Sequence, residues 1–458
     1  MKPYPVRRFA IVMALGIVVA ACGGDGGTSN ETDDGSTSAA AAGEAEIAET
    51  EITDKAAEQS DAAGAVMITI ESWRSDDAAI WDEQIIPAFE AQFPHIDVAF
   101  TPTAPIGYDA ALDARLAAGT AGDVIACRPF DTSLALFERG DLASLIDLPG
   151  MENFSPVAKI AWSTDDTSTP FCVPVASVIH GFIYNKTAFD ELGLVEPRTE
   201  EEFFELLEAI SDDGSYVPLL MGTADRWEAA TMGFENIGPN YWKGEQGRRA
   251  LIGGTAKLTD QAYVDTLTTL QRWSEYLPDG ASALTYADAQ NLFTRGGAAV
   301  YPAGSWEIAG FTAESDFELG AFPPPPRAGQ DTCYISDHTD IGLGLNAASG
   351  APEAARTFLA WVASSEFARV LVNALPGFFS LQDSPVASPD LLAQEFASWR
   401  DDCESTIRIS SHMLSRGEPR LEDELRAVSV GVLTAGMDPL DGARRLGAAL
   451  DAWHTPAR

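Results

Sequence analysis

The sequence predicts an α/β protein of two lobes, joined by a hinge of three chain crossings with a cleft between the lobes. Two observations lead to this prediction. From Val66 onward, segments with strand-like alternation of apolar residues take turns with segments of helical spacing. This rhythm is then interrupted three times, near residues 169, 319 and 373. Three interruptions between α/β segments indicate that the chain passes repeatedly between two lobes, and a cleft between lobes is a common place for a ligand.

The first 21 residues have the pattern of an export signal. Three basic residues precede an apolar run (9–21) that is too short for a permanent membrane anchor. The run ends in Val19-Ala20-Ala21-Cys22, which matches the lipobox, where the cysteine is lipidated and becomes the new N-terminus. An ordinary signal peptide with a chance cysteine is the alternative. We expect an extracytoplasmic protein anchored to the cell membrane through Cys22.

Residues 22–65 are expected to form a flexible tether. Residues 23–65 contain eleven Asp and Glu, one Lys and almost no large apolar side chain. Such a composition does not build a core. The fold is therefore expected to begin near Val66.

The remaining chain of about 390 residues suits roughly two domains. Of the net charge of −40, the signal carries +3 and the tether −10, and the body carries the remaining −33. A surface this acidic repels nucleic acid, which we exclude as a partner.

Four cysteines remain after lipidation of Cys22, namely Cys127, Cys172, Cys333 and Cys403. An even number in an exported protein predicts two disulfides, for which the sequence alone allows three pairings. A metal site is the alternative, but the cysteine spacings and the five scattered histidines do not match one. We expect neither a metal nor another cofactor.

The elements of the body follow from the periodicity. In the first part we expect a strand at 66–72, a helix at 78–93 that ends at Pro94, a strand at 96–100, a helix at 108–116 and a buried strand at 121–127. Beyond the first interruption we expect a strand at 179–184, helices at 199–210 and 260–276, a strand at 317–322, a strand-like segment at 340–347 and a helix at 351–372. Thr199 and Glu202 fit a capping box at the start of one helix. After the third interruption the chain is expected to be mostly helical.

Four stretches, in this order, carry a resemblance to a known family. They are "AGDVIACRPFDTSLALFERGDLASL", "VPVASVIHGFIYNKTAFDELGL" with "RTEEEFFELLEAI" behind it, "LFTRGGAAVYPAGSWEI" and "NAASGAPEAARTFLAWVASSEF". The chain resembles the extracellular solute-binding lipoproteins of ABC importers, in the carbohydrate-binding class that includes the maltose and raffinose types. The resemblance covers nearly all of residues 66–458.

The resemblance implies a monomeric two-lobed trap that closes on a sugar or oligosaccharide and presents it to permease subunits in the membrane. It implies an N-terminal lobe of residues 66–174 and 323–376 and a C-terminal lobe of residues 177–320 and 378–458. It also favours pairing Cys127 with Cys172 within one lobe, and Cys333 with Cys403. The second pair would join late segments of the two lobes and limit their opening.

A sugar cleft needs aromatic platforms and polar side chains that pair with hydroxyls. The resemblance places Trp306 and Trp227 as aromatic contacts, although each also fits a role in packing. Arg128 and Asp131 follow a predicted strand, where they would contact hydroxyls or form a salt bridge that caps the next helix.

Further candidates lie at other strand ends and crossings. Asp76 and Asp77 occupy the first strand-to-helix loop, where one of them also fits a helix cap. His338, Asp340 and Phe378 lie near the second and third crossings, where they would touch the ligand or shape the hinge. Weaker candidates are Tyr108, Glu228 and Trp242.

Three other functions fit parts of the same pattern. A secreted glycosidase also needs a cleft and two carboxylates, but the sequence contains no catalytic motif, and we expect no enzyme. A related trap for iron, polyamines, glycerol phosphates or peptides is the second alternative, although no basic or tyrosine-rich cluster is evident. A surface sensor that binds sugar and signals to a membrane kinase is the third.

Overall fold

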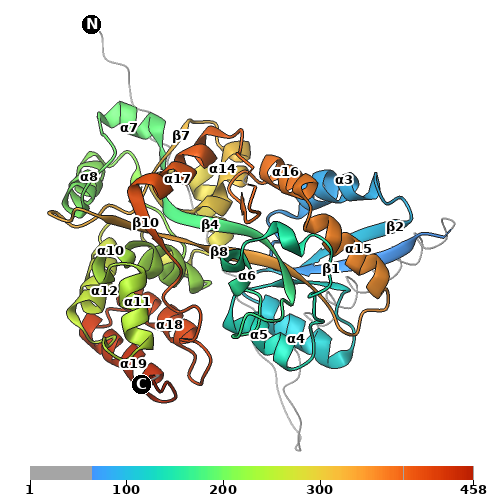
Figure 1. Cartoon of the computed structure of the whole chain (residues 1–458). Helices are drawn as coiled ribbons and strands as arrows, with labels where there is room; N and C mark the ends of the chain where they lie inside the picture. The colour runs from blue at the N-terminus through green and yellow to red at the C-terminus, as the bar shows by residue number, and fades with distance from the viewer. Residues whose placement is uncertain (1–63, 385, 457–458) are drawn as a thin grey trace, which may run out of the picture. The chain divides into compact units, whose positions relative to one another are not determined.

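The computed structural model describes residues 64–384 and 386–456 (Figure 1). The predicted export signal, Cys22 and the tether up to residue 63 lie outside the described residues. Within the described residues, no helix is both long and apolar enough to cross a membrane. The strands are β1 (Val66–Ser72), β2 (Ile96–Pro102), β3 (Val124–Cys127), β4 (Cys172–Asn185), β5 (Val217–Leu219), β6 (Ala298–Gly304), β7 (Leu319–Phe322), β8 (Cys333–Leu345), β9 (Phe379–Ser380) and β10 (Cys403–Thr406).

The strands form one connected network with the order β2-β1-β3-β8-β4-β6-β5. β10 pairs with β8, and β7 and β9 pair with β4. β1 runs parallel to both β2 and β3, as the alternation of strands and helices predicts. β8 is antiparallel to both β3 and β4. β5 is parallel to β6, so the network is mixed, with parallel pairs at both ends and antiparallel pairs between them.

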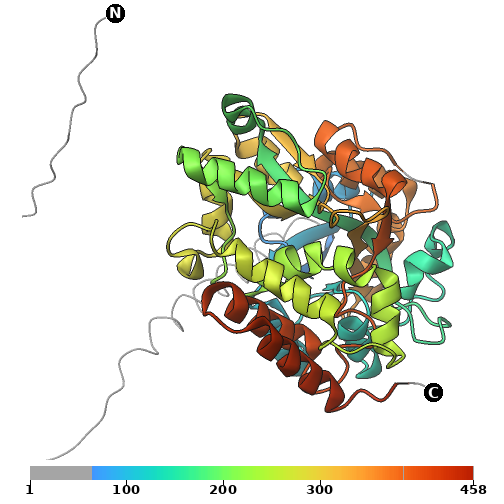
Figure 2. The ribbon, with the colours of Figure 1, turned by 90° about the vertical axis from the view of Figure 1, so that its left-hand side faces the viewer.

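Helices cover both ends of this network. In chain order the helical segments are α2 (Ala78–Ile80), η1 (Trp81–Ile85), α3 (Ile86–Glu90), α4 (Tyr108–Ala118), α5 (Asp131–Glu138), η2 (Met151–Asn153), α6 (Pro156–Ile160), α7 (Lys186–Leu192), α8 (Glu200–Asp213), η3 (Ala229–Phe234), α9 (Glu235–Ile237), α10 (Pro239–Trp242), α11 (Glu245–Ile252), α12 (Gln261–Trp273), η4 (Ala281–Ala283), α13 (Tyr286–Thr294), η5 (Ser305–Glu307), α14 (Ile308–Glu314), α15 (Pro352–Val362), α16 (Ser365–Ala374), α17 (Leu391–Asp402), α18 (Leu421–Thr434) and α19 (Pro439–Asp451). Figure 2 shows α12, α18 and α19 packed together at one end.

The first predicted strand–helix repeat is confirmed. β1 has the predicted bounds, and the helix expected at 78–93 runs from Ala78 to Glu90 as α2, η1 and α3, with one π-helical stretch in the middle. Its apolar side chains Ile85 and Phe89 are fully buried, which is what their helical spacing predicts.

Two local predictions differ from the structure. The helix expected at 351–372 is two helices, α15 and α16, because Ser364 interrupts it and accepts a hydrogen bond from the Phe367 amide (3.3 Å) as a new N-cap. Thr199 caps α8 as predicted and accepts from the Glu202 amide (3.2 Å). The Glu202 carboxylate, however, accepts from the Arg198 amide (2.7 Å) and not from the Thr199 amide, so the predicted capping box is only half formed.

β4 and β8 are the long strands that carry the chain across the middle of the body (Figure 1). β4 is one buried strand of 14 residues, where the sequence predicted a crossing and then a separate strand at 179–184. Its first part pairs with β8 and its last part with β6 and β7. The register of β4 on β8 shifts beside Pro174, which has no amide hydrogen to donate to the ladder.

We call the part built on β1, β2 and β3 the N-terminal lobe and the part built on β5, β6 and β7 the C-terminal lobe. The resemblance assigned residues 323–376 to the N-terminal lobe. The Asn240 amide group instead donates to Tyr334 O (3.2 Å) and its oxygen accepts from Tyr334 N (2.9 Å). Since Asn240 lies in α10 of the C-terminal lobe, we propose that the second crossing falls within β8 and not at residue 323.

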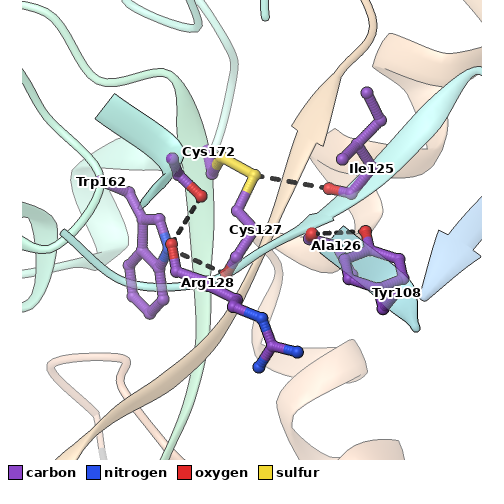
Figure 3. Close-up of a disulfide and its surroundings, with 8 residues drawn as sticks. Tyr108, Ile125, Ala126, Cys127, Arg128, Trp162 and Cys172 are labelled. Atoms are coloured by element: carbon purple, nitrogen blue, oxygen red, sulfur yellow. Dashed lines mark hydrogen bonds between the residues drawn. A yellow bond between two sulfur atoms is a disulfide. The ribbon is translucent and has the colours of Figure 1, made fainter. Parts of the chain in front are cut away.

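The two disulfides join Cys127 with Cys172 and Cys333 with Cys403, which confirms the favoured pairing. The first links the end of β3 to the start of β4, beside Trp162, whose indole N–H donates to Cys127 O (3.1 Å; Figure 3). The second joins the first residues of β8 and β10, which pair directly in the sheet. If the second crossing falls within β8 as proposed, this second disulfide lies on one side of it and does not tie the lobes together.

Removal of the first disulfide tests its contribution to stability. The Cys127→Ala/Cys172→Ala double variant should lose about 4 kcal/mol of unfolding free energy, because a link over a separation of 45 residues restricts the unfolded chain. Denaturant unfolding of the oxidised proteins measures this. Cys22→Ser is the matched control and should unfold like the wild type. Equal stability of all three proteins would contradict a stabilising disulfide between Cys127 and Cys172.

Candidate functional site

A cavity lies where the two lobes meet, with a volume of about 100 Å³. Trp73, Arg74, Pro105, Ile106, Asp109 and Arg128 line it from the N-terminal lobe, Trp227, Thr231, Tyr286, Trp306, Arg408, Glu422 and Arg426 line it from the C-terminal lobe, and Asp340 lines it from β8. Pockets for organic ligands commonly span about 300–1,000 Å³. This cavity is smaller than such pockets.

One wall of the cavity is aromatic. The ring of Trp227 lies 4.8 Å from that of Tyr286 and 6.4 Å from that of Trp306, between ring centroids. The Trp306 indole N–H donates to the Tyr286 hydroxyl (3.0 Å), which in turn donates to Glu307 Oε1 (2.7 Å). Gln290 donates to the other carboxylate oxygen of Glu307 (2.8 Å). The buried Glu307 thus fixes the orientation of the wall without lining the cavity itself.

The local sequence explains where Trp306 lies. β6 ends at Gly304, and η5 begins with the next residue. A Cβ at Gly304 would come within 1.9 Å of the Trp306 ring, so the absence of a side chain at this position lets the indole lie against the backbone. Trp306 is only 6% exposed, which makes it a core residue with one face toward the cleft.

The opposite wall follows the ends of two neighbouring strands. Trp73 comes directly after β1 and Arg128 directly after β3, and the two strands are parallel neighbours, so these residues meet. The Arg128 guanidinium lies 4.6 Å from the Trp73 ring and its Nε donates to Asp109 (2.8 Å). In Figure 3 this guanidinium points away from the neighbouring disulfide.

Charged side chains lie between the two walls. Arg74 is buried and pairs with Asp77 (2.5 Å) and Asp76 (3.0 Å). Burial raises the pKa of Asp77 to about 6, although the Arg74 charge opposes this. The Arg408 guanidinium lies 3.8 Å from Asp340, and its Nε is buried without a hydrogen-bond partner among the described residues. The cavity therefore offers both donors and acceptors.

Comparison with known proteins identifies the family. Residues 72–368 match the model of the bacterial extracellular solute-binding proteins, which is more than half of the chain. The chain belongs to this family. The multiple sugar-binding protein of Streptococcus mutans is 23% identical over 321 residues, which are 67% of this chain and 71% of that protein.

Solved structures share the fold of this solute-binding protein. A protein of xylan utilisation from Caldanaerobius polysaccharolyticus superposes with a TM-score of 0.73 at 17% identity, covering 84% of this chain and 99% of the other. RafE in complex with raffinose superposes with a TM-score of 0.70 at 20% identity, covering 85% of this chain and 99% of the other. A Bacillus licheniformis sugar transporter in complex with stachyose superposes with a TM-score of 0.68 at 16% identity, covering 84% of this chain and 98% of the other.

These matches confirm the predicted family and the α/β fold of the periplasmic binding-protein type. The family consists of extracellular solute binders and not of enzymes, which removes the glycosidase alternative. Within the described residues, no group of three or more His, Cys, Asp or Glu side chains is arranged to hold a metal ion.

The structure brings part of the predicted contact set together. Trp227, Trp306, Arg128 and Asp340 all line the cavity of this solute-binding protein. Asp76 and Asp77 do not line it, but they hold Arg74, which does. Their role is therefore to position a neighbouring cation.

Asp131 lies elsewhere. It does not line the cavity, and its carboxylate accepts hydrogen bonds from the Met413 amide and from Arg416. His338 is buried against His180, with 2.9 Å between their Nε2 atoms, and burial holds the pKa of each well below its usual value. We therefore leave Asp131 and His338 out of the proposed ligand contacts.

The other candidates outside the cavity lining are buried in packing roles. Phe378 lies 5.0 Å from the Arg74 guanidinium and supports it from behind. Trp242 stacks on Tyr263 (5.6 Å), and the Tyr108 hydroxyl donates to Ala126 O (2.8 Å) inside the N-terminal lobe.

Several lining residues were not predicted from the sequence. They are Trp73, Arg74, Pro105, Ile106, Asp109, Thr231, Tyr286, Arg408, Glu422 and Arg426. Trp73 and Arg74 directly follow the predicted strand at 66–72 and adjoin the Asp76 loop, so their place at a strand end could have identified them as cleft residues. Arg408 and Arg426 follow no strand of the parallel part, and no local pattern marks them.

Glu228 gives a pH-dependent test of the wall behind Trp227. Its side chain is fully buried and neither carboxylate oxygen has a hydrogen-bond partner among the described residues. Burial, with the nearby charges of Asp225 and Glu307, raises the pKa of Glu228 to about 8. The folded state therefore keeps a proton that the unfolded state loses above about pH 4.5, so stability should fall as pH rises from about 4.5 to 8.

Glu228→Gln should remove this loss. We expect the variant to be more stable than wild type by on the order of 3 kcal/mol at pH 8 and equally stable near pH 4.5, because the amide never ionises. Denaturant unfolding at both pH values measures the difference. Glu314→Gln, at an exposed position, is the control and should change stability at neither pH. A gain that is the same at both pH values would contradict the buried-proton explanation.

Proposed function

We propose that this solute-binding protein captures a sugar, in particular an oligosaccharide, between its lobes and delivers it to the permease subunits of an ABC importer. One observation carries the proposal: aromatic rings and charged hydrogen-bonding groups from both lobes line the same cavity. Sugars have weakly apolar C–H faces that stack on aromatic rings and hydroxyl edges that pair with charged donors and acceptors.

The relatives support the choice of ligand class. The Streptococcus mutans relative is named a multiple sugar-binding protein, and two of the similar structures hold raffinose and stachyose. They support an oligosaccharide in preference to a peptide or a metal ion. They do not assign one sugar to this chain.

In the proposed complex, Trp227 is the main aromatic platform, because it is the least buried ring of its wall. Arg128 and Arg408 donate to hydroxyls, and Asp340 accepts from them. Since these groups come from both sides of the cleft, a bound sugar gains its full set of contacts only when the lobes close. Ligand binding then stabilises the closed state, which the permease recognises.

A phosphate-bearing solute is the second candidate, because the fold gathers four cavity-lining arginines that the sequence did not reveal as a cluster, namely Arg74, Arg128, Arg408 and Arg426. Carboxylates already lie beside all four, at 2.5 Å (Asp77 to Arg74), 2.8 Å (Asp109 to Arg128), 2.5 Å (Glu422 to Arg426) and 3.8 Å (Asp340 to Arg408). These pairs largely neutralise the cavity, which favours an uncharged polyol over a polyanion. A sensor role would use the same cleft and differ only in the membrane partner.

Calorimetric titration with raffinose and stachyose tests the proposal. Wild type should bind at least one of them, and Trp227→Ala should weaken that affinity by about tenfold to a hundredfold through loss of the stacking surface. Because Trp227 is only partly buried, the thermal stability of the unliganded variant should change little.

Phe93→Ala, a partly buried aromatic residue outside the cavity, is the control and should leave affinity unchanged. If a screen of neutral mono- and oligosaccharides produces no shift in unfolding temperature while a phosphorylated solute does, the second candidate replaces the first.

We also propose that lipid on Cys22 holds the protein beside its permease. Diacylation supplies two chains, which anchor a protein stably where a single chain would not. Labelled fatty acid should appear on wild type and be absent from Cys22→Ser, which should leave the membrane fraction while keeping its sugar affinity. Membrane retention of Cys22→Ser would contradict this anchor.

A further inference from the structure

A second cavity, with a volume of about 380 Å³, adjoins the cavity with the aromatic wall, which we call the first cavity. Asp109 and Arg128 line both, so the two cavities meet at this pair. The first cavity, at about 100 Å³, is smaller than the roughly 300–1,000 Å³ that pockets for organic ligands commonly span. The second cavity falls within that range. The space beside the aromatic wall therefore continues beyond Arg128.

Both lobes build the second cavity. In the N-terminal lobe, α4 and α5 lie side by side (Figure 1), and residues of both helices line the cavity, among them Thr132 and Ala135 of α5. From the C-terminal lobe it is lined by Ser415, Arg416 and Arg420, which lie between β10 and α18. Since the first cavity is also lined from both lobes, the two cavities are successive parts of one cleft.

The junction between the two cavities consists of charged side chains. On one side, Arg128 Nε donates to Asp109 (2.8 Å), and the Asp109 side chain is 42% exposed. On the other side, Arg420 of the second cavity donates to Glu422 of the first (3.2 Å). Such side chains offer further donors and acceptors to a polar ligand that passes between them. A chain of sugar units can therefore run from the first cavity into the second.

The chemistry of the second cavity suits hydroxyl groups. Its arginines are already paired, Arg139 with Asp113 (2.7 Å) and Arg416 with Asp131 (2.7 Å), so they do not form a site of free positive charge for a phosphate. The Thr132 hydroxyl accepts from an arginine of the other lobe (3.2 Å), and no acceptor among the described residues takes its own proton. The cavity thus offers donors and acceptors without a strong net charge.

The second cavity has no aromatic platform. Among the described residues that line it, Tyr108 alone is aromatic, and this ring is only 1% exposed. Its hydroxyl donates to Ala126 O (2.8 Å; Figure 3). The first cavity therefore presents ring faces on which a sugar unit stacks, whereas the second presents groups that bond the hydroxyl edges of the units that follow.

We propose that the second cavity binds the further units of an oligosaccharide longer than a disaccharide. One unit stacks on Trp227, the next passes Arg128 at the junction, and the following ones lie between α5 and the segment that carries Ser415. The inference rests on the proposed function, because it extends the same cleft. The side chains of Asp113 and Arg139 are 57% and 50% exposed, so the second cavity reaches solvent and the end of a longer chain can leave it.

Two series of sugars that lengthen by one unit test the inference by calorimetric titration of the full chain. They are sucrose, raffinose and stachyose, and maltose, maltotriose and maltotetraose. In a series that binds, wild type should bind the tetrasaccharide at least tenfold more tightly than the disaccharide. The reason is that each additional hydrogen bond to a hydroxyl group raises the affinity by about twofold to tenfold.

Two variants alter the second cavity alone. Ala135→Trp places a large side chain in this cavity from an exposed position of α5, and should weaken tetrasaccharide binding at least tenfold more than disaccharide binding. Thr132→Val removes one hydroxyl group and should weaken tetrasaccharide binding by about twofold to tenfold. Ala114→Trp, at an exposed position of α4 outside both cavities, is the matched control and should bind like wild type.

The outcomes separate this inference from the proposed function. Equal affinity of wild type for the disaccharide and the tetrasaccharide, or an equal loss for both in Ala135→Trp, would overturn the second sugar site and leave the proposed function in place. Unfolding temperatures check that the variants fold, and if Ala135→Trp does not, Thr132→Val decides. If neither series binds, a series built on the sugar found in the thermal screen replaces them. A screen without any bound sugar would reject the proposed function and the second site together.

Discussion

The antiparallel pairing of β4 with β8 is the constraint on which the rest of the structure depends. Each strand belongs to both lobes, so the register that joins Val173 to Leu343 and Val178 to His338 fixes the two walls of the cleft relative to each other. The register shift beside Pro174 lies between these two pairs, and β9 joins β4 at the same level through Ser177 and Phe379. The sheet on either side of this level is held by further strand partners.

Charge pairing organises the space that these strands define. The chain has a net charge of −40, yet its cleft concentrates guanidinium groups, each placed beside carboxylates. Arg74 is held by Asp76 and Asp77, and on the aromatic side Glu307 holds Tyr286, which holds Trp306. Buried charges and hydroxyls with such partners keep fixed positions, so the cleft is largely arranged before a ligand arrives.

The predictions from the sequence succeeded where the signal is local. The strand at 66–72, the helix that follows it and the cap at Thr199 depend on residues only a few positions apart, and periodicity and capping rules describe such neighbours directly. Trp306 and Trp227 were found through a resemblance and do line the cavity. Asp131 had an equally good local context, but it accepts from Arg416, 285 residues further along the chain. No rule based on neighbours in sequence reaches that partner.

By itself, the sequence determined the α/β rhythm, the three interruptions, the acidic segment before Val66 and the presence of four cysteines suited to two disulfides. Only the tertiary structure decided that β4 is one continuous strand, that Cys333 and Cys403 lie on two strands that pair directly, and that Arg408 and Arg426 line the cavity while Asp131 pairs with Arg416. The physical reason is the range of the interactions. Hydrophobic periodicity and capping act between near neighbours in the chain, whereas an arginine pairs with whichever carboxylate the folded backbone brings within about 3 Å.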